Sequence, residues 1–443
     1  MTTPGRPVDV GQLLDEGNWS GYQKFVVFLS ALAIIFDGVD NQLLGLAIPS
    51  IMREWSMPRS AFASVGALGF VGMLIGAGLA GVVADRSGRR GALIASMLLF
   101  GAMTIAASFV NSIAALGTLR LLVGIGLGGA LPCAATLSSE FVPRRHRPFA
   151  VTLTIVCVPL GAMLAGLIAE RALPTVGWRG LFALGGAVPF AVAVLLFWLL
   201  PESPRFLARH PQRRLELFAT LRRAGHSIDA DATVVDAADL HVDRPSALTV
   251  LRPPYVRDTL ALWGAYISCL LAVYLGFTWV PSMLSGAGLG SLASLGITTF
   301  NLGGVIGAIA GSLAIARIGS RITMIAMAVG ALVSAIVMRG MTIGADSATF
   351  PIVVMLALTG GLINAVQTTL YALAAHVYPT ALRSTGVGSA AGIGRLGAIL
   401  SSYAGAWALD AAGSRGFFTV VAAAMSVTVI SLALVRRHVP RST

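Results

Sequence analysis

Two aspartates, Asp37 and Asp40, lie in an otherwise apolar stretch of the sequence, FDGVDNQLLGLAI. A carboxylate in membrane hydrocarbon costs about 2.5–3.5 kcal/mol on insertion scales, so such residues are usually functional. The i, i+3 spacing puts both on one helix face. Two carboxylates that close in a low dielectric cannot both ionise cheaply, so we expect at least one to hold a proton. The pattern favours proton coupling; the alternative is a structural pair bound to an arginine such as Arg120.

Two arginines lie within apolar segments and need anionic partners. Arg120, in RLLVG, can pair with Asp37 or Asp40, either as part of the coupling device or as a structural ion pair. Arg395, in GIGRLGA, needs a protein carboxylate or the carboxylate of a bound substrate. The planar guanidinium of arginine binds a carboxylate through two hydrogen bonds. The alternative for Arg395 is a structural pair, or a side chain that reaches to the cytoplasmic side.

A polar stripe interrupts a further apolar segment. Asn364, Gln367 and Tyr371 have the spacing of one helix face, which should look into a cavity or onto another helix. We treat the stripe as a candidate substrate surface, together with three residues of the neighbouring segments: Tyr274, Trp279 and Asn301. An aromatic ring among them can stack on an aromatic substrate, whereas helix packing explains any single one equally well.

The composition indicates a multi-pass membrane protein. Hydrophobic residues make up 56% of the 443 residues, charged residues only 11%, and soluble proteins carry about 25% charged residues. The apolar runs have the length of membrane helices rather than of β-barrel strands. The net charge of +12 does not indicate nucleic-acid binding, because the arginines cluster in short loops between apolar runs. The three cysteines lie far apart in apolar runs, and neither a metal site nor a cofactor is expected.

Twelve apolar segments are each long enough to cross a bilayer as a helix. We predict them at 25–49, 62–83, 91–110, 113–139, 149–171, 178–200, 258–284, 290–315, 321–343, 350–378, 384–409 and 416–436. The even-numbered loops are richer in arginine than the odd-numbered ones, which predicts that these loops and both termini are cytoplasmic.

The predicted domain organisation follows from one long polar interruption. It gives a tail at 1–24, a six-helix bundle at 25–200, a linker at 201–257, a second six-helix bundle at 258–436 and a tail at 437–443. Within the linker, RRLELFATLRRAG fits a short amphipathic surface helix.

The two halves show traces of an internal duplication. A shift of 236 residues superposes EFVPRRHR (140–147) on HVYPTALR (376–383), and a shift of 231 superposes DRSGRR (85–90) on ARIGSR (316–321). Repeats of this kind are common in transporters.

The stretch GVVADRSGRR (81–90) resembles the loop signature of the major facilitator superfamily, and the twelve segments in a 6+6 division fit that superfamily. The resemblance implies an all-α membrane fold of two pseudo-symmetric halves. It also implies a gating role for the loop, with Gly88 permitting a tight turn. We expect Glu140 and Arg147 to join the loop in one ion-pair network, the candidate gating residues being Asp85, Arg86, Gly88, Arg89, Arg90, Glu140 and Arg147.

Narrower features resemble the aromatic acid:proton symporters. These are DGVD (37–40), RLLVGIGLGGALPCAATLSSEFVPRRHR (120–147), PESPR (201–205) and YPTALRSTGVGSAAGIGRLGAI (378–399). Two departures stand out: Val39 replaces the phenylalanine that this family usually has, and Ala316 stands where the first half has Asp85. The resemblance favours Arg395 as the ligand of a substrate carboxylate.

The sequence as a whole predicts a monomeric secondary transporter of the bacterial inner membrane. It would use protons, coupled through Asp37, Asp40 and Arg120, to import a small aromatic carboxylate such as benzoate or a hydroxybenzoate. The alternatives are a symporter of another organic or sugar acid, a proton-driven drug exporter and, remotely, a membrane enzyme or sensor.

Overall fold

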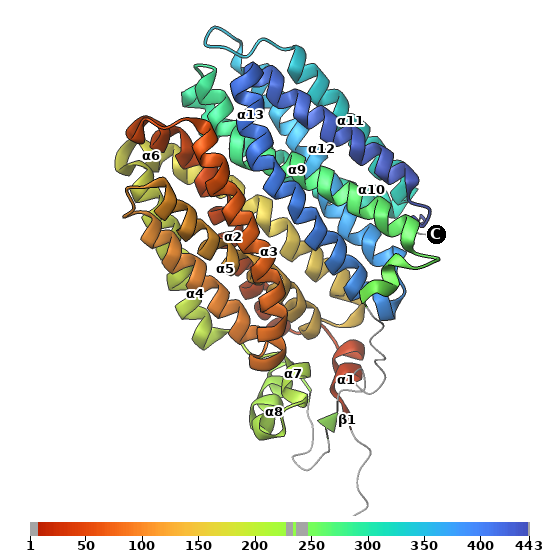
Figure 1. The fold of residues 1–443 in the computed structure, drawn as a ribbon. Helices are drawn as coiled ribbons and strands as arrows, with labels where there is room; N and C mark the ends of the chain where they lie inside the picture. Colours follow the sequence, from red (N-terminus) through yellow and green to blue (C-terminus); the bar gives the residue numbers. More distant parts are fainter. Residues whose placement is uncertain (1–7, 227–233, 236–246, 442–443) are drawn as a thin grey trace, which may run out of the picture.

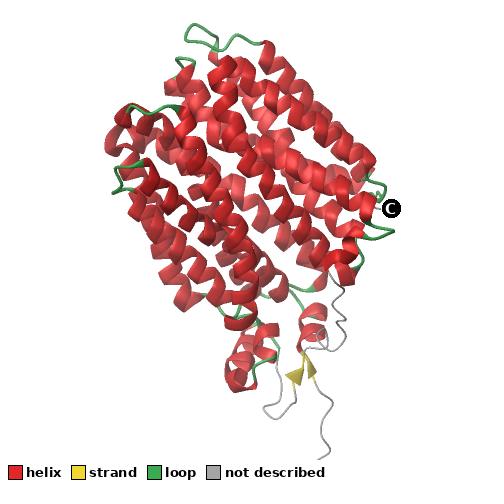
Figure 2. Ribbon diagram, viewed as in Figure 1, coloured by secondary structure: helices red, strands yellow, loops and turns green. Residues whose placement is uncertain are grey.

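The computed structural model describes residues 8–226, 234–235 and 247–441. Parts of the predicted tails and linker lie outside these ranges. The described residues are almost entirely helical (Figure 2). The long helices of the first half are α2 (Gly21–Trp55), α3 (Arg59–Ser87), α4 (Arg89–Ala107), α5 (Ile113–Phe141) and α6 (Arg147–Leu199). Those of the second half are α9 (Val256–Gly286), α10 (Ala293–Ile318), α11 (Ser320–Gly340), α12 (Thr349–Val377) and α13 (Thr380–Leu434).

These ten helices are long and apolar enough to cross a membrane, and two of them account for two crossings each. Helix α6 has 53 residues and α13 has 55, well over twice the roughly 20 residues that a membrane-spanning helix needs. The backbone of α6 leaves helical geometry at Gly177, and that of α13 does so at Ala412 and Gly413. The described chain therefore has twelve membrane-spanning segments, each within a few residues of its predicted position.

The two halves pair their segments in the same way. In the N half (α2–α6), α2 packs on α6 and α3 packs on α5. In the C half (α9–α13), α9 packs on α13 and α10 packs on α12. The halves meet where α3 contacts α13, α10 contacts α6 and α2 contacts α9 (Figure 1). This symmetric pattern of contacts confirms the predicted fold of two pseudo-symmetric six-helix halves.

The turns repeat as well, at the shifts predicted from the sequence. Gly88 (φ 92°, ψ 161°) and Gly319 (φ 86°, ψ 162°) each end one helix and begin the next. Gly177 and Gly413 are the corresponding reversals of α6 and α13, again with positive φ. Positive φ values of this kind favour glycine, so the duplicated glycines preserve duplicated turns.

Shorter elements gather at one end of the bundle, here called the linker end. They are β1 (Val8–Asp9), α1 (Val10–Glu16), η1 (Arg144–His146), α7 (Pro204–Ala208), η2 (Pro211–Arg213), α8 (Arg214–Arg223), β2 (Val234–Val235) and η4 (Ala247–Leu251). The short helix η5 (Gly290–Leu292) lies at the opposite, far end, where α9 gives way to α10. Helix α8 is the amphipathic helix that the linker sequence predicts. Val10 and Leu14 of α1 join Leu207, Leu217 and Leu221 in a small apolar cluster separate from the main core.

Candidate substrate and proton site

A small cavity of about 40 Å³ lies at the middle of the bundle, between the halves. Its lining comes from both halves: Asp37, Asn41, Met73, Leu131, Ile155, Val158 and Pro159 on one side, and Leu270, Val273, Tyr274, Phe277, Asn364, Gln367, Tyr371 and Arg395 on the other. One carboxylic acid, one guanidinium, three side-chain amides and two tyrosines therefore share one otherwise apolar chamber. We call it the central cavity.

Arg395, near the middle of the first span of α13, is the cation of the central cavity. Its Nη1 donates a 2.6 Å hydrogen bond to the hydroxyl of Tyr274, and its guanidinium lies 5.8 Å from the centre of that ring. Nη1 also lies 3.7 Å from Sδ of Met73 in the other half. Within the described part of the chain, no carboxylate lies within 4.0 Å of Arg395, although Asp37 is near enough to attract it. An incoming anion would thus meet a guanidinium with unused donors.

Asp37 is the acid of the central cavity and is buried. Nδ2 of Asn41, one helical turn along α2, donates a 2.6 Å hydrogen bond to its Oδ1. Sequence reasoning missed Asn41, although its i, i+4 distance from Asp37 was a usable signal. Asp37 therefore accepts a hydrogen bond from one amide and is attracted by the more distant Arg395.

Asp40 has different partners. It is fully buried inside the N half, where Nη1 of Arg120 lies 3.1 Å from its Oδ2 and the hydroxyl of Thr104 donates to its Oδ1. The sequence left open which aspartate Arg120 would pair with, and the structure pairs it with Asp40. Arg120 also lies over the ring of Phe182. Only Asp37 of the two aspartates faces the chamber, so the two carboxylates have separate environments.

The polar stripe of α12 faces the central cavity along its whole length. Asn364, Gln367 and Tyr371 all line the cavity, as their helical spacing predicts. The ring of Tyr371 stands edge-on to that of Tyr266, with 5.5 Å between ring centres. Tyr274 likewise meets Phe70 of the other half, with 4.6 Å between ring centres. The chamber thus offers aromatic surfaces beside its charged groups.

Two candidate substrate residues lie elsewhere. Trp279 is fully buried, with its indole against Gly405 of α13. It follows Tyr274 by five residues, which rotates it well away from that side chain around the helix. Asn301 is also fully buried, and its Nδ2 donates to the carbonyl of Ile297 in its own helix. Neither is among the residues that line the central cavity, so the structure places them in helix packing instead.

The candidate gating loop forms an ion-pair cluster within the N half at the linker end. Nη1 of Arg89 lies 2.8 Å from Oδ1 of Asp85, and its Nε lies 3.7 Å from Oε1 of Glu140. Asp85 therefore pairs with an arginine of its own half. Arg86 is exposed. The structure thus shows the loop tied to the end of α5.

Glu202 is a member of this cluster that sequence reasoning missed. It is buried, and its Oε1 accepts hydrogen bonds from the backbone N–H of Arg90 at 3.1 Å and of Ser203 at 2.9 Å. The guanidinium of Arg90 donates to the carbonyl of Phe197. A Cβ on Gly88 would overlap Oε2 of Glu202, so this position needs glycine. The sequence did contain a signal for Glu202, because it is the acid of PESPR, which directly follows a predicted membrane segment.

Arg147 does not join this cluster, which corrects the expectation of one network with Glu140. Its guanidinium binds Asp15 of α1, and its Nε donates a 2.8 Å hydrogen bond to the carbonyl of Ser139. Arg205 also binds Asp15, at 3.3 Å. Glu140 instead accepts from the hydroxyl of Ser203 and pairs with Arg89. The physical reason is that α1 folds back onto the linker end and brings its own carboxylate.

Among the described residues, no group of three or more His, Cys, Asp or Glu side chains is placed to hold a metal ion. The chemistry available in the central cavity is therefore that of a carboxylate, a guanidinium, amides and phenols. Such a set can bind an organic anion and exchange a proton.

Comparison with known proteins identifies relatives over nearly the full length. The chain is 35% identical over 401 residues to the gallate transporter of Pseudomonas putida, covering 90% of this chain and 88% of that protein. It is 32% identical over 412 residues to the 4-hydroxybenzoate transporter PcaK of Pseudomonas putida, covering 91% and 90%. These relatives confirm the resemblance to aromatic acid transporters.

The fold matches a solved transporter structure. The inward-open conformation of the xylose transporter XylE from Escherichia coli superposes with a TM-score of 0.75 at 16% identity, covering 94% of this chain and 97% of that one. The sequence model of the Major Facilitator Superfamily matches residues 30–338. The prediction of a transporter rather than an enzyme is thereby confirmed. This multi-pass membrane protein belongs to the major facilitator superfamily.

Proposed function

We propose that this protein is a proton-coupled symporter that imports a small aromatic carboxylate across the bacterial cytoplasmic membrane by alternating access. The relatives named for gallate and 4-hydroxybenzoate support the substrate class. The observation that carries the proposal is the opposition of Arg395 and Asp37 across one aromatic-lined central cavity. A chamber with this composition suits a ring that carries a carboxylate.

Substrate binding centres on Arg395. Its guanidinium presents a planar fork that matches a carboxylate, and its bond to Tyr274 fixes where that fork points. The rings of Tyr274 and Tyr371 flank the substrate ring, while Asn364 and Gln367 supply donors and acceptors for ring hydroxyls. Asn301 and Trp279 pack within the helices that carry the site and do not contact the substrate in the central cavity.

Proton coupling arises because Asp37 and the substrate carboxylate compete for the positive charge of Arg395. While the chamber is empty, Arg395 attracts the carboxylate of Asp37. A substrate carboxylate that binds Arg395 neutralises this positive charge. The charged form of Asp37 is then less stabilised, so protonation of Asp37 becomes more favourable. The loaded chamber then carries no excess negative charge. Asp40, held by Arg120 and Thr104, keeps α2 in place and serves as the second carboxylate of the coupling device.

We infer the orientation of the protein in the membrane from the distribution of its arginines. We place the linker end, with its clusters at 86–90, 144–147 and 205–223, in the cytoplasm together with both termini. On this orientation the predicted tails (1–24 and 437–443) and the predicted linker (201–257) are also cytoplasmic. A monomer is sufficient, because a single chain supplies both halves of the site.

The structure then represents an inward-facing state. Contacts at the centre and the far end join the halves: Gln42 donates to the carbonyl of Phe277 at 2.6 Å, the ring of Phe70 contacts that of Tyr274, and Arg59 pairs with Asp410. The ion pairs of the gating cluster at the linker end all lie within one half. Rocking about the central cavity would exchange these contacts for others at the linker end.

Uptake into proteoliposomes tests the proposal. The purified protein is reconstituted, and labelled gallate, 4-hydroxybenzoate and benzoate are offered with and without an inward-directed proton gradient. We expect accumulation of at least one acid with the gradient, and its loss when a protonophore is added. Equal uptake of the acid with and without the gradient would contradict proton coupling, and the absence of any uptake would contradict the substrate class.

A further inference from the structure

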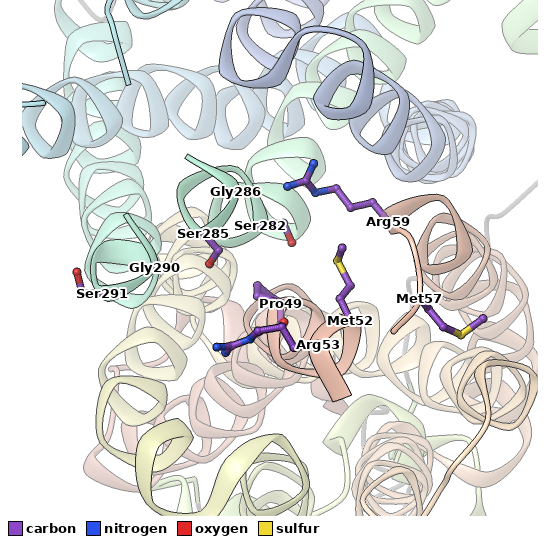
Figure 3. A pocket seen from close by; sticks show the side chains of 10 residues that line it. All are labelled: Pro49, Met52, Arg53, Met57, Arg59, Ser282, Ser285, Gly286, Gly290 and Ser291. Carbon is purple, nitrogen blue, oxygen red and sulfur yellow. The ribbon is translucent and has the colours of Figure 1, made fainter. Parts of the chain in front are cut away.

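A second and much larger cavity opens between the halves at the far end of the molecule, with a volume of about 560 Å³ (Figure 3). It is lined by Pro49, Met52, Arg53, Met57, Arg59, Ser282, Ser285, Gly286, Gly290 and Ser291. The end of α2 and the start of α3 form one wall, and the end of α9 with η5 forms the other. Ligand pockets measure about 300–1,000 Å³, so this volume is in the range for a small organic molecule. We call it the outer cavity.

Arg59 crosses the outer cavity from one half to the other. It begins α3 in the N half, and its Nη1 lies 3.4 Å from Oδ1 of Asp410 in the C half. Figure 3 shows its side chain extended toward Gly286 of α9, where a Cβ would overlap the guanidinium. Asp410 is half exposed, and the contact is long for an ion pair. A buried Nε of Arg59 has no hydrogen-bond partner among the described residues.

Ser282 provides independent evidence for a ligand site. Its side chain lines the outer cavity and is only 2% exposed, yet its hydroxyl has no hydrogen-bond partner among the described residues. A buried polar group without a partner costs about 1–3 kcal/mol. Hydroxyl and guanidinium are both donors, and they come from opposite walls of one cavity. Their common complement is an anion.

The remaining lining selects the kind of anion. Met52 lies between Arg59 and Pro49 in Figure 3, and methionine sulfur contacts aromatic rings favourably. Arg53 adds a second positive charge on the same wall, where its Nε donates to the carbonyl of Pro49. With two arginines, a free hydroxyl and a thioether, the outer cavity suits a small aromatic carboxylate.

We propose that the outer cavity is a second carboxylate site, in which an aromatic acid binds Arg59 and Ser282 before it enters the central cavity. This inference rests on the proposed function and adds a site to it. The arriving carboxylate takes the place of Asp410 beside Arg59. Because that ion pair joins the two halves, its exchange for a substrate weakens the contact between the halves at the far end. Substrate binding in the outer cavity thereby favours the outward-facing state.

Equilibrium dialysis of the full-length protein in detergent, with labelled benzoate at fixed pH, tests the site. We expect two bound equivalents for the wild type, one for Arg395→Gln, one for Arg59→Gln and none for the double variant. Arg339 is an exposed arginine of the far end, so Arg339→Gln combined with Arg395→Gln is the matched control and should still bind one equivalent. Unlabelled benzoate should displace the label at concentrations at which acetate and chloride do not.

Two further variants, each made together with Arg395→Gln, separate binding from folding. Ser282→Ala should weaken the remaining site about tenfold, because a hydrogen bond to a charged group is lost. Asp410→Asn should instead tighten it several-fold, since the competing carboxylate is removed. Tighter binding cannot result from misfolding.

The outcomes are distinguishable. One equivalent in the wild type that Arg395→Gln abolishes would overturn the outer site and leave the proposed function intact. Unchanged or weaker binding by Asp410→Asn would overturn the exchange at Arg59. A wild type that binds no benzoate, gallate or 4-hydroxybenzoate would remove the proposed function and the outer site together.

Discussion

The guanidinium of Arg395 donates a 2.6 Å hydrogen bond to the hydroxyl of Tyr274, and both residues belong to the C half. The cation of the central cavity is thus oriented by its own half, while the acid of the same cavity, Asp37, belongs to the other half. On the proposed function, a substrate anion held by Arg395 would therefore stay with the C half as the N half moves. The first prediction concerns these two residues, because Arg395 would bind the substrate and Tyr274 would orient Arg395.

Replacing Arg395 by Gln should weaken binding of an aromatic carboxylate to the central cavity by about 10- to 100-fold, because a hydrogen bond to a charged group is lost. Tyr274→Phe keeps the ring and removes only the orienting hydroxyl, so its loss of affinity should be less than about tenfold. Labelled-ligand binding to purified protein measures both. Equal losses for the two variants would contradict a direct contact of Arg395 with the substrate.

Asp37→Asn should abolish the response of uptake to a proton gradient while exchange of substrate across the membrane survives. The asparagine keeps a hydrogen-bond acceptor for Asn41 but cannot release a proton. Counterflow and gradient-driven uptake in proteoliposomes separate the two activities. Gradient-driven accumulation by this variant would show that Asp37 is not the required coupling group.

Asp40→Asn should act mainly on stability. It leaves Arg120 as a buried cation without its counter-charge, and breaking a buried pair from one side costs about 3–5 kcal/mol. Thermal unfolding in detergent should show a lower Tm, with part of the loss recovered in Asp40→Asn/Arg120→Gln. A variant with the stability of the wild type but no gradient response would instead make Asp40 the coupling carboxylate.

Gly88→Ala should disrupt the ion-pair cluster formed by Asp85, Arg89 and Glu140, which Glu202 adjoins. Its φ of 92° alone costs a residue with a side chain about 1–3 kcal/mol, and the added Cβ overlaps the buried carboxylate of Glu202. Gly319→Ala is the matched control, because Gly319 has the same backbone but its nearest neighbour, the carbonyl oxygen of Val439, lies 3.2 Å from a Cβ. Transport rate and Tm should fall further for Gly88→Ala. Equal losses of transport rate and Tm in the two variants would contradict a role of Glu202 in positioning the loop at Gly88.

Leu14→Ala should release α1 from the linker end. Leu14 is fully buried against the apolar cluster with α8, and such truncations cost about 2–5 kcal/mol in a packed core. Limited proteolysis of detergent-solubilised protein should then cut near residue 17 faster than in the wild type. Gln12→Ala, on the exposed side of the same helix, is the control and should leave the rate unchanged.

The sequence predicts the membrane-spanning segments well because each is an apolar run set off by polar turns, and no tertiary information is needed to find it. It also predicts the cavity stripe of α12, since Asn364, Gln367 and Tyr371 share one face and the face of a polar stripe is the one that avoids lipid. The continuity of α6 through Gly177 was not visible, because a glycine also marks ordinary loops.

Pairing between distant segments was harder to predict. The partner of Arg120 depends on the rotation of α2 about its axis, which the spacing of Asp37 and Asp40 leaves open. Asp15 could not be assigned to Arg147, because 132 residues separate them and only the folding of α1 onto the linker end brings them together. Trp279 shows the converse: its residue type suits substrate stacking, but its position on α9 turns it into the core.

At two turns of the far end, Gly177 in α6 and Ala412–Gly413 in α13, the chain reverses with almost no loop. An antibody, a protease or a labelling reagent therefore has little backbone to reach at either place. Residues 341–348, between α11 and α12, are the more accessible handle at that end. On the proposed orientation, an antibody should detect an epitope inserted there on intact spheroplasts without permeabilisation, whereas one inserted beside α8 should require permeabilisation.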